Sequence, residues 1–154
     1  MKKEVRVIGV DDAPFDKFKR GNVLVVGTIF RGGSFLDGLV STKVRVDGQN
    51  STVKISEMIN KCKFKPQLQC IILDGIAVGG FNIIDIVKLK KETGIPVMVV
   101  MRNYPDFKKI ELTLKKLKKE EKINLLHSAG TVSYTHLRAH ETRHDLVCRL
   151  LLEK

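Results

Sequence analysis

The sequence predicts an α/β fold in which a three-stranded antiparallel meander is followed by βαβ units. Short apolar runs rich in β-branched residues recur along most of the chain, which is typical of strands. The early runs are separated by short polar or glycine-rich turns, and the later runs by amphipathic helical patterns. Strands joined through a helix are parallel and form a right-handed crossover, so we expect a mixed sheet.

Three strands are expected first, at residues 4–10, 23–30 and 35–46. Pro14 ends regular pairing after the first strand, because it has no backbone N–H and a fixed φ. The glycine-rich segment 31–34 has the length of a hairpin turn. The third strand alternates valine and threonine with polar residues, which predicts one buried and one wet face.

The second part of the chain alternates helices and strands. We expect a helix from Asn50 or Ser51 to about Lys61, because either residue is a good N-cap. Asn82 is the expected N-cap of the next helix, and Gly94 its C-terminal glycine. The remaining expected elements are a strand at 70–74, a helix at 82–93, a strand at 95–101, a helix from about 106 to 119 and a short strand at 123–126.

Aspartates stand where two apolar strands end. Asp11 and Asp12 follow the first strand, and Asp74 closes the run that begins at Cys70. Adjacent residues on a strand point to opposite faces, so at most one of Asp11 and Asp12 is expected to face a shared site. A meander followed by βαβ units is the arrangement of a ribonuclease H-like sheet, in which these two strands are neighbours. Asp74 also fits a simple role as the cap of the next turn.

The paired aspartates predict a metal site. Two or three carboxylates that hold Mg²⁺ (or Mn²⁺), with positions open to phosphate and water, suit phosphodiester hydrolysis. Asp47 is the candidate third ligand beside Asp11 and Asp74, although an ordinary Asp-Gly turn explains it equally well. Other chemistries find little support, because the glycines of residues 75–80 match neither the dinucleotide-binding fingerprint nor the P-loop.

The charge of the chain predicts an anionic partner. The 28 Lys and Arg residues against 17 Asp and Glu give a net charge of +11, which favours nucleic acid. Arg31, Arg102, Lys108 and Lys109 are the candidate phosphate contacts, although lysine-rich helices are often only solvated faces. No apolar run is long enough for a bilayer and none resembles a signal peptide, so we expect a cytoplasmic protein with no membrane partner. The sequence indicates no particular protein partner.

Residues 131–154 differ abruptly in character from the rest of the chain. Val132 to Glu141 back-translates to the end of a transposase-type sequencing adapter, and Leu146 to Lys154 to a flow-cell primer. We therefore expect 1–130 to be the genuine domain, incomplete at its C-terminus, and 131–154 to be a non-native tail. His136, His140 and His144 have metal-ligand spacing on a helix, but we assign that spacing to the adapter. Without the tail, 24 basic and 14 acidic residues still give +10.

Several motifs resemble a mostly archaeal family catalogued as domain of unknown function 99. They are Ile8-Gly9-Val10-Asp11-Asp12-Ala13-Pro14-Phe15, Phe30-Arg31-Gly32-Gly33-Ser34-Phe35-Leu36-Asp37-Gly38, Val46-Asp47-Gly48, Leu73-Asp74-Gly75-Ile76-Ala77-Val78-Gly79-Gly80-Phe81-Asn82, Gly94-Ile95-Pro96-Val97 and Arg102-Asn103-Tyr104-Pro105-Asp106. The resemblance covers nearly all of residues 4–127.

That family is considered similar to endonuclease V, a Mg²⁺-dependent nuclease with a ribonuclease H-like fold that acts at deaminated purines. The resemblance implies that Asp11 and Asp74 match the two metal-binding aspartates, and that Asp47 replaces the glutamate of the triad. Endonuclease V continues Gly-His-Gly after the second aspartate, whereas this chain reads Gly75-Ile76-Ala77. The leading hypothesis is a metal-dependent nuclease. The alternatives are a nucleic-acid-binding relative that has lost cleavage and a small-molecule binder at the same strand ends.

Overall fold

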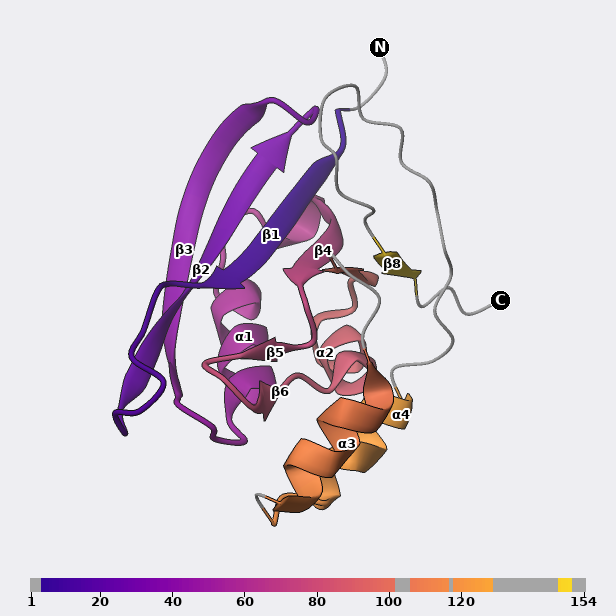
Figure 1. The fold of residues 1–154 in the computed structure, drawn as a ribbon. Coiled ribbons are helices and arrows are strands. Elements are labelled where there is room, and N and C mark those ends of the chain that lie inside the picture. Colours follow the sequence, from indigo (N-terminus) through magenta and orange to yellow (C-terminus); the bar gives the residue numbers. More distant parts are fainter. Residues whose placement is uncertain (1–3, 102–105, 117, 129–146, 151–154) are drawn as a thin grey trace, which may run out of the picture.

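The computed structural model describes residues 4–101, 106–116, 118–128 and 147–150, and a six-stranded mixed sheet organises them (Figure 1). The strand order is β3-β2-β1-β4-β7-β8, and a separate two-stranded ladder pairs β5 with β6. The strands are β1 (Arg6–Asp12), β2 (Asn22–Arg31), β3 (Phe35–Arg45), β4 (Leu68–Asp74), β5 (Ala77–Val78), β6 (Asn82–Ile83), β7 (Val97–Met101) and β8 (Val147–Leu150).

β1 lies in the middle of the sheet. It pairs antiparallel with β2 and parallel with β4, and β2 pairs antiparallel with β3. β4 pairs parallel with β7, and a helix connects the two strands along the chain, which is the expected βαβ unit. This arrangement confirms the predicted ribonuclease H-like α/β sheet, and it places the carboxyl ends of β1 and β4 side by side.

In the described part of the chain, the α-helices beside the sheet are α1 (Ser51–Asn60), α2 (Ile86–Thr93), α3 (Phe107–Lys116) and α4 (Glu121–Ser128). α1 and α2 cover one face of the sheet (Figure 1). Side chains that alternate along the strands, such as Ile8 and Ile71, are fully buried in one core with Ile55 and Ile59 of α1 and Leu89 of α2. α3 and α4 form a hairpin beside this unit. Within the described residues, none of the helices is long and apolar enough to cross a membrane. A 3₁₀ turn lies at Lys65–Gln67, before β4.

Two local predictions are wrong. Residues 123–126 belong to α4 and not to a strand, since the apolar positions Ile123 and Leu126 have a spacing that also fits one face of a helix. The second predicted helix starts later, because Asp85 and not Asn82 caps α2 by accepting a hydrogen bond from the Lys88 N–H. Asn82 is instead fully buried in β6.

The buried amide of Asn82 joins three segments. Its Oδ1 accepts from the Ser51 N–H at 3.1 Å, and its Nδ2 donates to the Arg45 carbonyl at 2.9 Å and to Asn50 Oδ1 at 3.0 Å. A side chain that both donates and accepts can satisfy backbone groups at the end of β3 and the start of α1 together. Asn82 therefore fixes the position of the segment that follows Asp74.

β8 lies inside the segment for which the sequence predicts a non-native origin. It pairs antiparallel with β7, with Val99 opposite Arg149. Neither this pairing nor the rest of the fold tests the origin of residues 131–154, so the division at residue 130 stays a prediction.

Candidate functional site

Asp11 and Asp74 lie at the carboxyl ends of adjacent parallel strands. The residues before them, Val10 of β1 and Leu73 of β4, are register partners and point into the helix-covered core. The two aspartates therefore point to the other face of the sheet. There they line one cavity of about 380 Å³, together with Thr28 of β2 and several apolar side chains. The structure thus brings the two principal predicted site residues together.

The surroundings of Asp11 disfavour its charge. Burial raises the pKa of its carboxyl above the usual value, and the neighbouring charge of Asp74 raises it further. The Asp12 N–H, which donates to Asp11 Oδ1 at 2.8 Å, opposes this effect. Two carboxylates at close quarters with apolar walls are costly to ionise together, and such sites are frequently functional.

A divalent cation fits this donor set. Hard cations such as Mg²⁺ take oxygen ligands, and Mg²⁺ is commonly held by one or two carboxylates plus substrate phosphates. Asp11 and Asp74 supply the carboxylates, and the bound cation would relieve the repulsion that raises the pKa of Asp11. Within the described ranges, no group of three or more Asp, Glu, His or Cys side chains is placed to share a metal ion.

Asp12 faces away from this cavity and holds the glycine-rich loop that follows Asp74. Its Oδ2 accepts a hydrogen bond from the Gly79 N–H at 2.6 Å. Consecutive residues at the end of β1 thus have different tasks, as the alternation of strand side chains predicts. Asp11 faces Asp74 across the cavity, and Asp12 attaches the loop after Asp74 to the end of β1.

Asp47, just after the end of β3, is hydrogen-bonded to the same loop. Its Oδ1 accepts from the Phe81 N–H at 2.8 Å, and its own N–H donates to the Gly79 carbonyl at 2.8 Å. A Cβ on Gly80 would lie 2.5 Å from Asp47 Oδ1, and Gly80 has a φ of +87°, so only glycine fits. The structure therefore gives Asp47 a positioning role, and its role as a third metal ligand stays a prediction.

Sequence reasoning missed a buried lysine behind this loop. Lys122 of α4 is only 2% exposed, and its Nζ donates to the carbonyls of Asp47, Gly48 and Phe81. Burial lowers its pKa below the usual value, and the nearby charge of Lys119 lowers it further. Lys119 Nζ also donates to the Asp47 carbonyl, at 3.1 Å. The charged hairpin of α3 and α4 is therefore attached to the loops of the site.

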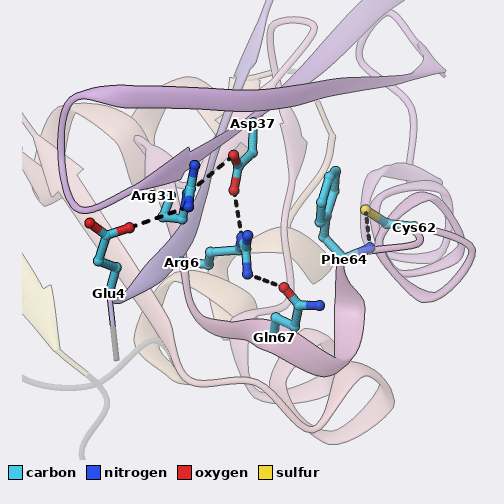
Figure 2. A network of polar contacts seen from close by, with 7 residues as sticks. All are labelled: Glu4, Arg6, Arg31, Asp37, Cys62, Phe64 and Gln67. Carbon is cyan, nitrogen blue, oxygen red and sulfur yellow. Dashed lines mark hydrogen bonds and ion pairs between the residues drawn. The ribbon is translucent and has the colours of Figure 1, made fainter. Parts of the chain in front are cut away.

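Arg31 lies at the opposite end of β1, since it pairs with Arg6 in the sheet register. We call the side chains gathered there, Glu4, Arg6, Arg31, Asp37 and Gln67, the arginine cluster (Figure 2). Arg31 is 3.4 Å from Asp37 and 3.5 Å from Glu4, and its guanidinium lies over the Phe35 ring. The structure does not bring Arg31 to Asp11 and Asp74.

The other three candidate phosphate contacts are not part of the arginine cluster. Lys108 and Lys109 are exposed on α3, where Lys109 lies 3.5 Å from Asp106. Arg102 lies outside the described residues. The assignment of all four basic residues to phosphate contacts stays a prediction.

Comparison with known proteins identifies close sequence relatives. Residues 3–148 match a family model described as endonuclease dU. A UPF0215 protein of Methanothermobacter thermautotrophicus is 50% identical over 115 residues, which are 75% of this chain and 56% of that protein. A UPF0215 protein of Methanosarcina barkeri is 44% identical over 133 residues, 86% of this chain and 67% of the relative. The chain thus spans little more than half the length of the first of these relatives.

Solved structures share the fold. A protein of unknown function from Archaeoglobus fulgidus superposes with a TM-score of 0.81 at 33% identity, covering 94% of this chain and 77% of its own. Endonuclease V of Ciona intestinalis, solved in complex with DNA that contains an inosine followed by a ribo-adenosine, superposes with a TM-score of 0.54 at 13% identity. The superposition covers 97% of this chain and 72% of the endonuclease V chain. This second likeness shows a shared fold.

Proposed function

This chain belongs to the endonuclease dU family, and from that membership we propose that it is a metal-dependent nuclease that hydrolyses phosphodiester bonds in DNA or RNA. One observation carries the proposal: Asp11 and Asp74 end adjacent parallel strands and line the same cavity. The likeness to a DNA-bound endonuclease V supports a nucleic-acid substrate on this fold.

Asp11 and Asp74 are the residues that would hold Mg²⁺ or Mn²⁺. When bound, the ion supplies a Lewis acid that neutralises phosphate charge and acidifies an attacking water. The side chains around the two carboxylates are mostly apolar, including Val26 and Val100, and they strengthen electrostatic interactions beside them. Asp12 and Asp47 hold the loop after Asp74 and so keep its carboxylate oriented toward Asp11.

Cleavage assays test the proposal. The full chain, with Mg²⁺ or Mn²⁺, is incubated with oligonucleotides that contain deoxyuridine or inosine and with unmodified DNA and RNA. The family name makes deoxyuridine the first substrate to try, and the inosine-containing DNA of the Ciona complex makes inosine the second. We expect cleavage that EDTA abolishes and that Asp74→Asn reduces more than about 100-fold. Cleavage at an undiminished rate by Asp74→Asn would refute the site.

A nucleic-acid-binding protein that keeps this fold without cleavage is the second candidate. It is favoured by the lack of a third ligating side chain beside Asp11 and Asp74 in the described part of the chain. Oligonucleotide binding without any cleavage, by a chain whose circular dichroism shows it folded, would select this candidate.

A further inference from the structure

The loop between β1 and β2 presents an aromatic ring to solvent. Residues 13–21 form this loop, and Asp16 shapes its tip by accepting hydrogen bonds from the Phe18 N–H at 3.0 Å and the Lys19 N–H at 3.2 Å. Phe18 stands at the tip and is 99% exposed. Its neighbours in the sequence are Lys17, Lys19 and Arg20, so the ring belongs to a basic stretch of the loop.

This loop forms one wall of a basic pocket of about 690 Å³. The end of β3 and the connection between α3 and α4 supply the other lining residues. Among the described residues that line the pocket, Asp47 is the single acid, and its carboxylate already accepts the Phe81 N–H. The lining cations are Lys17, Lys19, Arg20, Arg45 and Lys119.

The walls of the pocket are joined by backbone and side-chain hydrogen bonds. The Val46 N–H donates to the Gly21 carbonyl at 3.0 Å, which ties the loop to the end of β3. Lys119 Nζ donates to the Asp47 carbonyl at 3.1 Å, which ties the helical hairpin to the same turn. The cations are therefore presented by connected parts of the fold, and their positive potential is concentrated in one concavity.

We propose that this pocket binds an unpaired segment of nucleic acid, with a base stacked on Phe18 and the flanking phosphates held by the lining lysines and arginines. Proteins that bind single strands combine a positively charged groove with exposed aromatic rings, because every base offers a π-face. A concave pocket with one projecting ring suits a flexible single strand better than a rigid duplex or a flat membrane surface.

The loop that carries Phe18 is connected to the segment after Asp74, although the pocket and the cavity of the paired aspartates have no described lining residue in common. The loop begins directly after Asp12, whose carboxylate holds Gly79 in the loop that follows Asp74. Asp12 thus joins the loop of the pocket to the segment that follows Asp74 at the carboxyl end of β4. The inference rests on the proposed function in one respect, since it assigns the platform for the strand on which Asp11 and Asp74 would act. Binding itself needs neither the metal nor cleavage.

Fluorescence anisotropy with a labelled single-stranded oligonucleotide of about a dozen nucleotides, in EDTA, tests the inference. We expect Phe18→Ala to weaken binding at least about fivefold, and Phe18→Trp to retain it, because loss of one stacked base has an effect of this size. Arg20→Ala should lower the slope of log Kd against log salt by about 0.7, the value for one lost phosphate contact on a single strand.

Lys61→Ala is the matched control. Lys61 is also exposed, but it lies beyond the far end of α1, away from the carboxyl ends of β1 and β4. Its replacement should change neither the affinity nor the salt slope by a comparable amount. Because Phe18 is almost wholly exposed, Phe18→Ala should melt at the wild-type temperature, and this measurement separates lost binding from lost folding.

Three results would overturn the inference. Unchanged affinity of Phe18→Ala for the single strand would exclude stacking. If the affinity for a duplex, or for vesicles rich in phosphatidylserine, depended on Phe18 as strongly as the affinity for the single strand, the pocket would not be specific for an unpaired strand. If the wild type did not bind the single strand at all, the proposed ligand of the pocket would be wrong. A chain that binds through Phe18 but never cleaves would refute only the proposed nuclease function.

Discussion

The two ends of β1 place acidic side chains in opposite surroundings. At the amino end, Asp37 lies between two arginines, with Arg6 Nε 2.5 Å from one carboxylate oxygen and Arg31 Nε 3.4 Å from the other (Figure 2). The hydrogen bond from Arg6 lowers the pKa of Asp37, and the Arg31 charge lowers it further. At the carboxyl end, burial and the charge of Asp74 raise the pKa of Asp11.

The opposite pKa shifts of Asp37 and Asp11 indicate a structural role for the first and a chemical role for the second. In the arginine cluster, Asp37 lies between two arginines that lower its pKa, so its ionisation stabilises the folded chain. At the carboxyl end, partial burial and the nearby charge of Asp74 raise the pKa of Asp11, so ionisation of Asp11 opposes folding. A protein keeps such an arrangement where a charged ligand is to be held, and this is why we place the function at the carboxyl end of β1.

The largest expected effect compares one aspartate from each end. Asp11→Asn should reduce cleavage more than about 100-fold while leaving the unfolding midpoint at or above that of the wild type, because it removes a carboxylate whose charge the folded chain disfavours. Asp37→Asn should lower the unfolding midpoint and leave the cleavage rate close to that of the wild type. Urea unfolding and cleavage rates measured on the same preparations check both. If Asp37→Asn lost cleavage as completely as Asp11→Asn, the two ends would not differ in role.

The next effect concerns the support behind the carboxyl end. Lys122→Met removes the ammonium group that satisfies three partly buried carbonyls, and should lower the free energy of unfolding by about 2 kcal/mol. Lys115→Met, an exposed position on α3, is the control and should change it by less than about 0.5 kcal/mol. Equal stability of the two variants in urea would show that α4 is not held to the loops of the site by Lys122.

The strands β1, β2, β3, β4 and β7 and their order are predictable because their signals are local and strong. Continuous or alternating β-branched runs select strands, and the helix between residues 74 and 95 fixes the parallel pair. The placement of Asp11 and Asp74 follows from that order alone. Alternation along β1 then separates Asp12 from Asp11, as the hydrogen bond from Gly79 to Asp12 confirms.

What the sequence does not predict are polar groups whose partners lie far along the chain. Asn82 is a good local N-cap, but its tertiary bonds to the ends of β3 and α1 override that preference. Lys122 belongs to a lysine-rich stretch that is typical of solvated helices, and only the docked hairpin explains its burial. Antiparallel pairing places Arg31 beside Arg6 at the amino end of β1, where it forms ion pairs with Glu4 and Asp37.

The smallest and most specific effect is the opposite pH dependence of the two aspartates, measured as urea midpoints between about pH 2 and 7 in EDTA. The pKa of Asp37 in the folded chain lies below the ordinary value of 3.8, so its stabilisation is present above pH 3.8 and is lost as the pH falls through the lowered pKa. The pKa of Asp11 in the folded chain lies above 3.8. Its ionisation therefore destabilises the folded chain as the pH rises from 3.8 through the raised pKa.

Asp37→Asn should therefore differ from the wild type above pH 3.8 and converge with it in stronger acid. Asp11→Asn should match the wild type in acid and become relatively more stable as the pH rises above 3.8. Added Mg²⁺ should reduce the second difference, since a cation between Asp11 and Asp74 favours the ionised pair, and should leave the first nearly unchanged. Parallel curves for the two variants would mean that the carboxylates at the two ends of β1 experience the same electrostatic environment.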